Sequence, residues 1–306
     1  MISDNLKGHL AAITTNVIFG LNISLTKALI VQSWIAPLGW TMTRMLFGFV
    51  MFWAFSFIVP SEKINFRDLL TLFACGILGL VVPQLSFFFG LLYISPVLSS
   101  LIPALNPIFV LLLSAVFLSD PVSLRKTIGV IIGMSGAALA VLQYGNGSTS
   151  INYFWGIGGL LLSVISNSSY LIIMRKIAVK YMPITIMKWM FLGAVIVLSP
   201  FGIPDLPGQR LYTPEVTLLP IVMVVFSLFL SVLLALIMMP VALRRIKATT
   251  VSMYANLQPL AASTAAIIVG QDVLSWDKPL ALILIVLGVF IVTRSQSPVN
   301  KEKKKT

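Results

Sequence analysis

Residues 94–140 read ISPVLSSLIPALNPIFVLLLSAVFLSDPVSLRKTIGVIIGMSGAALA, and residues 246–292 read IKATTVSMYANLQPLAASTAAIIVGQDVLSWDKPLALILIVLGVFIV. Sliding the chain by 152 positions aligns these two stretches without a gap. The aligned pairs are Leu105 with Leu257, Pro107 with Pro259, Asp120 with Asp272, Ser123 with Ser275, Lys126 with Lys278, and Gly136 with Gly288. Asn106, before the first proline, corresponds to Gln258 before the second. The alignment predicts that the chain contains two copies of one structural unit.

The rest of the chain is as apolar as these two stretches. Of its 306 residues, 58% are hydrophobic and only 10% are charged, whereas a soluble protein carries about a quarter charged residues. Apolar runs of roughly 20 residues, enough to cross a bilayer core as a helix, recur along the chain. Barrel strands are shorter and alternate in polarity, so the predicted fold is an all-α integral membrane protein. We predict ten transmembrane helices, at 10–31, 38–59, 69–92, 97–118, 127–143, 155–174, 184–200, 217–239, 248–269 and 279–293.

The basic residues of the connections indicate the orientation, because positively charged loops stay in the cytoplasm. With the N-terminus inside, only Arg210 and Lys278 fall outside. The apolar run after Lys7 lacks the small-residue cleavage pattern of a signal peptide and is interpreted as a helix. We therefore expect a multi-pass protein of the cell inner (plasma) membrane with both termini in the cytoplasm. The basic residues placed inside are Lys7, Lys63, Arg67, Arg125, Lys126, Arg175, Lys176, Lys180, Arg244, Arg245, Lys247, Arg294, Lys301, Lys303, Lys304 and Lys305.

An odd number of helices in each copy reverses the second copy in the membrane. The predicted domains are a first five-helix repeat at 1–143, a second, inverted repeat at 155–293, and a basic cytoplasmic tail at 294–306. Inverted repeats are typical of secondary transporters, in which they give one conformation open to each side and a substrate site near the midplane. The repeat pattern therefore predicts a solute transporter that works by alternating access.

Several short motifs carry a family resemblance. They are Gly90-Leu-Leu-Tyr-Ile-Ser-Pro96, Pro103-Ala-Leu-Asn-Pro107, Leu118-Ser-Asp-Pro-Val-Ser123, the glycine helix from Gly129 to Gly136, Leu257-Gln-Pro259 and Gly270-Gln-Asp272. With them the chain resembles the drug/metabolite transporter superfamily with two EamA-type repeats, although an Asp stands in both halves where that family usually has Glu. The resemblance implies a ten-helix exporter of amino acids or other small metabolites, and it leaves the substrate open.

Three ionisable side chains fall inside predicted spans, namely Lys27, Arg44 and Lys188, whereas all nine acidic residues fall in loops or tails. A charge in hydrocarbon is costly and usually faces a functional cavity. We therefore predict a substrate with a carboxylate or another anionic group, attracted by Lys27 and Arg44. For Lys188, a substrate role and snorkelling to the interface both remain open.

Polar side chains extend the predicted site. Several share one face of the first helix, and three amides adjoin prolines, where a helix break is tolerated if the backbone lines a cavity. Whether Asn106 and Gln258 touch the substrate or only mark kinks stays open. The predicted substrate-binding residues are Asn16, Gly20, Asn22, Lys27, Arg44, Gln84, Asn106, Lys188, Tyr254 and Gln258.

Other function classes fit the sequence less well. The stretch Gly133-Met-Ser-Gly136 imitates an intramembrane serine protease, but the only histidine, His9, lies outside the membrane core, so a base is missing. We expect no enzyme activity, no metal and no cofactor. The net charge of +12 is dispersed over loops beside the bilayer and favours anionic lipids over nucleic acid as partners. The prediction is a secondary transporter that exports a small polar metabolite, such as an amino acid or organic acid, as a monomer or homodimer. A polar-solute channel and a multidrug efflux transporter of the same fold are the alternatives.

Overall fold

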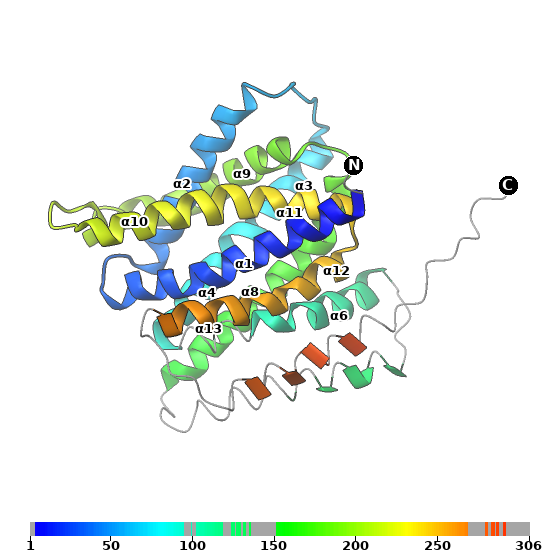
Figure 1. The fold of residues 1–306 in the computed structure, drawn as a ribbon. Helices are drawn as coiled ribbons and strands as arrows, with labels where there is room; N and C mark the ends of the chain where they lie inside the picture. Colours follow the sequence, from blue (N-terminus) through cyan, green and yellow to red (C-terminus); the bar gives the residue numbers. More distant parts are fainter. Residues whose placement is uncertain are drawn as a thin grey trace.

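The structure is a computed structural model. It describes residues 4–94, 102–118 and 151–268, with single residues and short segments between 99 and 135 and between 279 and 291. All regular secondary structure in the described part of the chain is helical (Figure 1), which confirms the all-α fold class. Most of the predicted span 127–143, about half of the predicted span 279–293, the tail 294–306, and the aligned Asp120 and Asp272 lie outside the described residues.

In the part of the chain that the structure describes, six helical stretches are long and apolar enough to cross a membrane. Four of them are single helices: α1 (Asp4–Val31), α2 (Pro37–Ser56), α8 (Ile151–Ala178) and α9 (Pro183–Asp205). The other two are composite, and each has a π-helical segment in the middle. The first joins α3 (Phe66–Gly76), η1 (Ile77–Val81) and α4 (Val82–Tyr93), and the second joins α10 (Leu218–Phe226), η4 (Ser227–Ala235) and α11 (Leu236–Arg245). These stretches correspond to six of the ten predicted spans.

Shorter helices complete the described chain. The 3-10 turn η2 (Pro103–Leu105) leads into α6 (Asn106–Leu118), and α12 (Ala248–Met253) leads through the 3-10 turn η5 (Tyr254–Asn256) into α13 (Leu257–Ile268). A third turn, η3 (Arg210–Tyr212), connects α9 to α10. The total of ten transmembrane helices stays a prediction, because the spans that end each half are described only in part.

The π segment η1 is followed by a proline whose missing N–H leaves a carbonyl free. Pro83 has no amide hydrogen to donate to the Leu78 carbonyl, five positions earlier. The Ser166 hydroxyl of α8 donates to that carbonyl instead, over 2.8 Å. A hydroxyl from another helix therefore replaces the missing backbone bond, which an apolar environment requires.

The π segment η4 has a similar arrangement. Pro240, inside α11 and four positions after Leu236, also lacks an amide hydrogen for a bond back along the helix, and Ala235 is the last residue of η4 just before α11. The Ala235 carbonyl accepts a hydrogen bond from the Thr15 hydroxyl of α1, over 3.1 Å. Each composite helix thus accepts, at a carbonyl of its π segment, a hydrogen bond from the first long helix of the other half of the chain.

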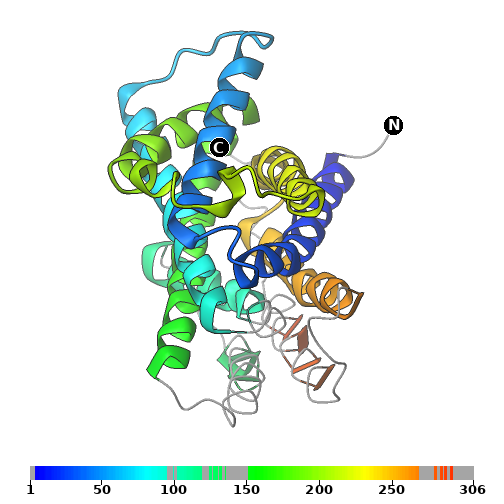
Figure 2. The same ribbon diagram turned by 90° about the vertical axis from the view of Figure 1, so that its left-hand side faces the viewer.

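The long helices fall into two groups. Figure 2 shows α1, α10–α11 and α13 on one side and α2, α3–α4, α8 and α9 on the other. In the second group α2 packs against α9, where a Cβ on Gly48 would lie 2.2 Å from the Phe191 ring. Phe52 stacks on the same ring, with 5.3 Å between centroids. Glycine therefore permits a close helix contact that a larger residue would open.

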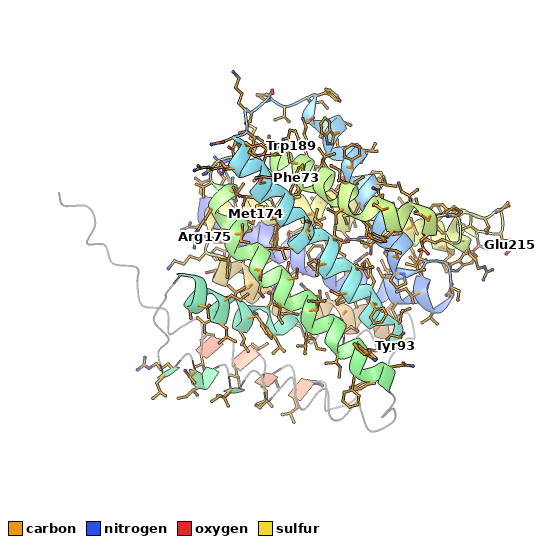
Figure 3. All side chains as sticks on the ribbon, turned by 180° about the vertical axis from the view of Figure 1, so that it is seen from behind. Phe73, Tyr93, Met174, Arg175, Trp189 and Glu215 are labelled. Carbon is orange, nitrogen blue, oxygen red and sulfur yellow. The ribbon has the colours of Figure 1, made fainter. Side chains whose placement is uncertain are left out.

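The outer surface of the bundle is apolar between two polar ends. Large side chains such as Phe154, Leu162, Ile196 and Leu218 are exposed on it. Figure 3 shows Arg175 and Trp189 toward one end of the helices, and Tyr93 and Glu215 toward the other. Such a surface suits a lipid environment with aqueous regions at both ends.

Candidate substrate-binding site

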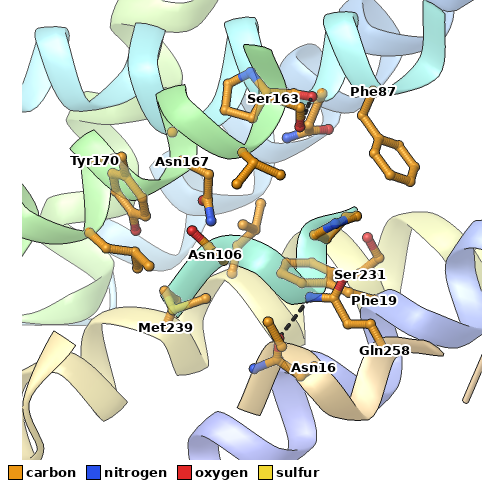
Figure 4. Close-up of a pocket in the computed structure, with 18 of the residues that line it drawn as sticks. Asn16, Phe19, Phe87, Asn106, Ser163, Asn167, Tyr170, Ser231, Met239 and Gln258 are labelled. Atoms are coloured by element: carbon orange, nitrogen blue, oxygen red, sulfur yellow. Dashed lines mark hydrogen bonds between the residues drawn. The ribbon is translucent and has the colours of Figure 1, made fainter. Parts of the chain in front are cut away.

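A cavity of about 150 Å³ lies between the two helix groups. Aromatic and aliphatic side chains such as Phe19, Phe87, Phe88 and Met239 form part of its wall (Figure 4). Amides, hydroxyls and one guanidinium form the rest. The polar lining residues are Asn16, Asn22, Arg44, Gln84, Asn106, Ser163, Asn167, Tyr170, Ser231, Ser252 and Gln258. An apolar pocket with a few convergent polar groups is the usual form of a small-molecule site.

Arg44, in α2, is the cationic group of this cavity and is only 2% exposed. Its Nε donates to Gln84 Oε1 of α4 over 2.6 Å, its Nη1 to Ser227 Oγ over 2.9 Å, and its Nη2 to Ser231 Oγ over 2.7 Å. The Phe88 ring lies 5.6 Å from the guanidinium carbon. Neutral groups from both halves of the chain therefore fix the guanidinium in place.

Within the described part of the chain, no carboxylate neutralises the charge of Arg44. None of the ion pairs among the described residues includes Arg44. Of the five N–H groups of a guanidinium, three are used by the contacts above. A buried charge without a counter-ion is unfavourable. The site therefore favours a ligand that brings a negative group to the two remaining N–H groups.

Two amide contacts in the wall of the cavity match each other across the repeat. Ser168 Oγ of α8 donates to Asn106 Oδ1 over 2.5 Å. Gln258 Nε2 donates to Asn16 Oδ1 of α1 over 2.7 Å (Figure 4). Asn106 and Gln258 are 152 positions apart, and so are Asn16 and Ser168. Equivalent positions of the two repeats therefore form two equivalent hydrogen bonds between the halves of the chain.

Six of the ten predicted site residues line the cavity: Asn16, Asn22, Arg44, Gln84, Asn106 and Gln258. They come from α1, α2, α4, α6 and α13, so the fold brings together side chains that are far apart in the sequence. Contact with a substrate stays a prediction for all ten.

The other four predicted residues make contacts elsewhere. A Cβ on Gly20 would lie 2.6 Å from the Gln258 carbonyl oxygen, so this position serves close packing of α1 on α13. Lys27 donates from its ammonium to the Leu91 carbonyl near the end of α4. The remaining two are Lys188, whose Nζ lies 4.2 Å from the centre of the Trp53 ring, and Tyr254, whose hydroxyl lies 2.8 Å from His9 Nδ1.

Several polar residues of the site were not predicted from the sequence, including Ser163, Asn167, Tyr170 and Ser231. Asn167 stands in the polar run 166–169, inside the predicted span 155–174, and that run was the available signal. No sequence signal indicated the serines, because serine is common in membrane helices and can hydrogen-bond the backbone of its own helix. Only the group that each serine contacts indicates its place in the site, and that group lies on another helix.

An all-helical bundle with an apolar exterior and a small polar cavity between its two helix groups is typical of membrane transport proteins. The sequence matches the EamA-like transporter family over residues 6–142 and again over residues 154–294. The chain belongs to this family, which consists of transporters. The match confirms the resemblance drawn from the sequence motifs.

Individual relatives are similar to parts of the chain. An uncharacterized transporter of Archaeoglobus fulgidus is 32% identical over 149 residues, which are 48% of this chain and 51% of the relative. A WAT1-related protein of Arabidopsis thaliana is 35% identical over 108 residues, 32% of each protein. The uncharacterized transporter YyaM of Bacillus subtilis is 25% identical over 223 residues, 70% of each. The chain thus spans about half of the archaeal relative and a third of the plant one.

The fold has a match among solved structures. A crystal structure with 19% sequence identity covers 95% of this chain and is itself covered over 96% of its length, with a TM-score of 0.67. At this identity the match supports the fold alone. In the described part of the chain, no group of three His, Cys, Asp or Glu side chains is placed to hold a metal ion.

Proposed function

We propose that the protein is a secondary transporter, working as an exporter, for a small metabolite that carries an anionic group. The observation that carries this proposal is the buried guanidinium of Arg44, which lines a cavity and has no carboxylate partner in the described chain. Its hydrogen bonds reach α4 of one half and η4 of the other. A ligand at Arg44 therefore lies between the parts that move in an alternating-access cycle.

The proposal includes two inverted halves, at 1–143 and 155–293. Matched local structure supports it: α1 and α8 each have 28 residues, and each half has a composite helix with a π segment. In Figure 1, α1 runs away from the end marked N, whereas α8 runs toward that end. The cross-half amide pairs related by 152 positions are what a pseudo-twofold axis in the membrane plane produces.

We further propose that the end holding the start of α1 faces the cytoplasm in the cell inner membrane, with both termini on that side. A Cβ on Gly8, near that start, would lie 2.8 Å from Arg245 Cβ at the end of α11. Basic residues at the ends of α8 and α11 support this orientation through the preference of positive charge for the cytoplasm. They are Arg175, Lys176, Arg244 and Arg245. Anionic lipid head groups are the corresponding partner.

The size of the cavity favours a small metabolite over drug-sized compounds. Its volume of about 150 Å³ lies below the roughly 300–1,000 Å³ of drug-sized sites. A channel for polar solutes is the second candidate, favoured by the amide and hydroxyl lining. Single-channel currents from the purified protein would favour the channel, and saturable counterflow would favour the transporter.

The test is flux of labelled organic acids and amino acids in liposomes that contain the full chain. For at least one carboxylate substrate we expect saturable counterflow, and we expect Arg44→Met to lower it at least about tenfold, since loss of a buried charged contact costs about 2–5 kcal/mol. Arg175→Met, which removes an exposed charge outside the cavity, is the matched control and should keep normal flux. Equal flux in both variants would refute the role of Arg44.

A further inference from the structure

The cavity has two chemically different poles. At one pole Arg44 is held by Gln84 and Ser231. At the other, Asn106, Asn167 and Tyr170 face the cavity from α6 and α8. Figure 4 shows Asn167 and Tyr170 on the opposite side of the cavity from Ser231, with the Asn167 amide directed toward Asn106. A ligand that fills the space therefore meets a cation at one end and amides at the other.

The amide pole has unused hydrogen-bonding capacity. Asn167 lines the cavity, and its side-chain amide makes no hydrogen bond within the described part of the chain. Asn106 Oδ1 accepts from Ser168, which leaves the amide N–H groups of Asn106 for other partners. These groups suit a neutral polar substituent that both donates and accepts, such as a hydroxyl or an amide.

The net charge of the cavity distinguishes an acid from a zwitterion. Among the described lining residues, Arg44 is the one charged side chain, and none is acidic. Two acidic side chains of the described helices are engaged elsewhere: Asp68 pairs with Lys180 over 3.0 Å, and Asp205 accepts from the Gly39 amide over 2.8 Å. A monoanion neutralises the cavity, whereas an ammonium group adds a second cation without a carboxylate partner.

We infer that the substrate is a small monoanionic acid with a second, neutral polar group, and that Asn167 recognises this second group while Arg44 binds the acid. The inference rests on the proposed function and narrows its substrate class. Hydroxy acids and amide-bearing acids fit this description. Zwitterionic amino acids and acids without a second polar group fit it less well.

Three compounds separate these possibilities, because lactate, propionate and alanine differ only in a hydroxyl, a hydrogen or an ammonium on the second carbon. Binding is measured by thermal stabilisation of the purified full chain, transport by competition in liposomes, and both are repeated with longer homologues of each compound. We expect a hydroxy acid to bind at least about tenfold more tightly than its two analogues, or roughly 1.4 kcal/mol. Asn167→Leu should reduce its affinity to that of the unsubstituted acid and leave the unsubstituted acid unchanged.

The control is Asn152→Leu, the same substitution at an exposed position of α8 outside the cavity, which should preserve the preference. Tighter binding of the amino acid, or equal weakening of all three compounds by Asn167→Leu, would overturn the inference and leave the transport proposal standing. Failure of every carboxylate to bind or compete would overturn both.

Discussion

The two π segments occupy matching places in the two halves, yet they present different groups to the cavity. Gly79 in η1 and Ser231 in η4 are 152 positions apart. A Cβ on Gly79 would lie 2.5 Å from the Tyr170 ring, so the missing side chain makes room for that ring. Ser231 instead accepts a hydrogen bond from Arg44. One segment admits an aromatic ring, and the other holds a charge.

The two π segments have the same backbone arrangement and differ in the groups that their side chains contact. Both segments are followed by a proline, and both have a carbonyl bonded by a hydroxyl from the other half. On the proposed mechanism, this shared backbone suits two similar conformations. The position that matches Ser227 is Cys75, a buried thiol outside the cavity lining. On the proposed function, the group that binds the acid is therefore held by one of the two π segments, and the other segment has no counterpart to it.

The largest expected effect comes from removing both serines of the charged side. In the double variant Ser227→Ala with Ser231→Ala, two buried N–H groups of Arg44 lose their acceptors, at about 1–3 kcal/mol each. We expect the free energy of unfolding in detergent, measured by denaturant titration, to fall by about 2–6 kcal/mol. The control pairs Ser169→Ala with Ser199→Ala, whose hydroxyls bond carbonyls of their own helices. A loss no greater than that of the control would show that the serines do not hold Arg44.

A smaller effect is expected on the aromatic side, and here its sign is informative. Gly79→Ala places a methyl group against Tyr170 and should destabilise the protein by about 1–3 kcal/mol through overpacking. Gly158→Ala is the matched control, because a Cβ there has nothing within 4 Å. A helical glycine replaced by alanine without a clash gains about 0.5–1 kcal/mol. Thermal unfolding should therefore shift in opposite directions, and shifts of the same sign would contradict the close approach at Gly79.

The fold was largely predictable because a helix that crosses a membrane needs an apolar run of matching length, and such runs are visible in the sequence. The spans expected at 38–59 and 184–200 correspond to α2 and α9 within a few residues. The span expected at 217–239 ends too early, since its helix continues to Arg245. A helix held by its backbone hydrogen bonds can extend beyond the hydrocarbon core of the membrane. The apolar run in the sequence, in contrast, ends at the edge of that core.

The site was predictable only where a single residue was unusual for its surroundings. Arg44 and Gln84 stand out in apolar spans, and both line the cavity. Lys27 is equally unusual, but its ammonium bonds the Leu91 carbonyl, a contact that depends on how α1 and α4 pack. Ser227 gains its role from a guanidinium 183 positions away in the sequence. Such roles arise from tertiary contacts, and composition and spacing do not contain them.

The smallest expected effect tests whether the hydroxyl bonds replace the hydrogen bonds that the prolines remove. Ser166→Ala should cost about 0.6 kcal/mol, an average hydrogen bond between membrane helices, because the Leu78 carbonyl then loses its donor. In a Pro83→Ala background the restored N–H can satisfy that carbonyl from within the helix, so the same serine substitution should cost less. The two losses are compared in a double-mutant cycle of unfolding free energies. Thr15→Val, which removes the corresponding donor to Ala235, should reproduce the first loss in the other half. Equal cost of Ser166→Ala in both backgrounds would mean that the hydroxyl does not substitute for the missing amide.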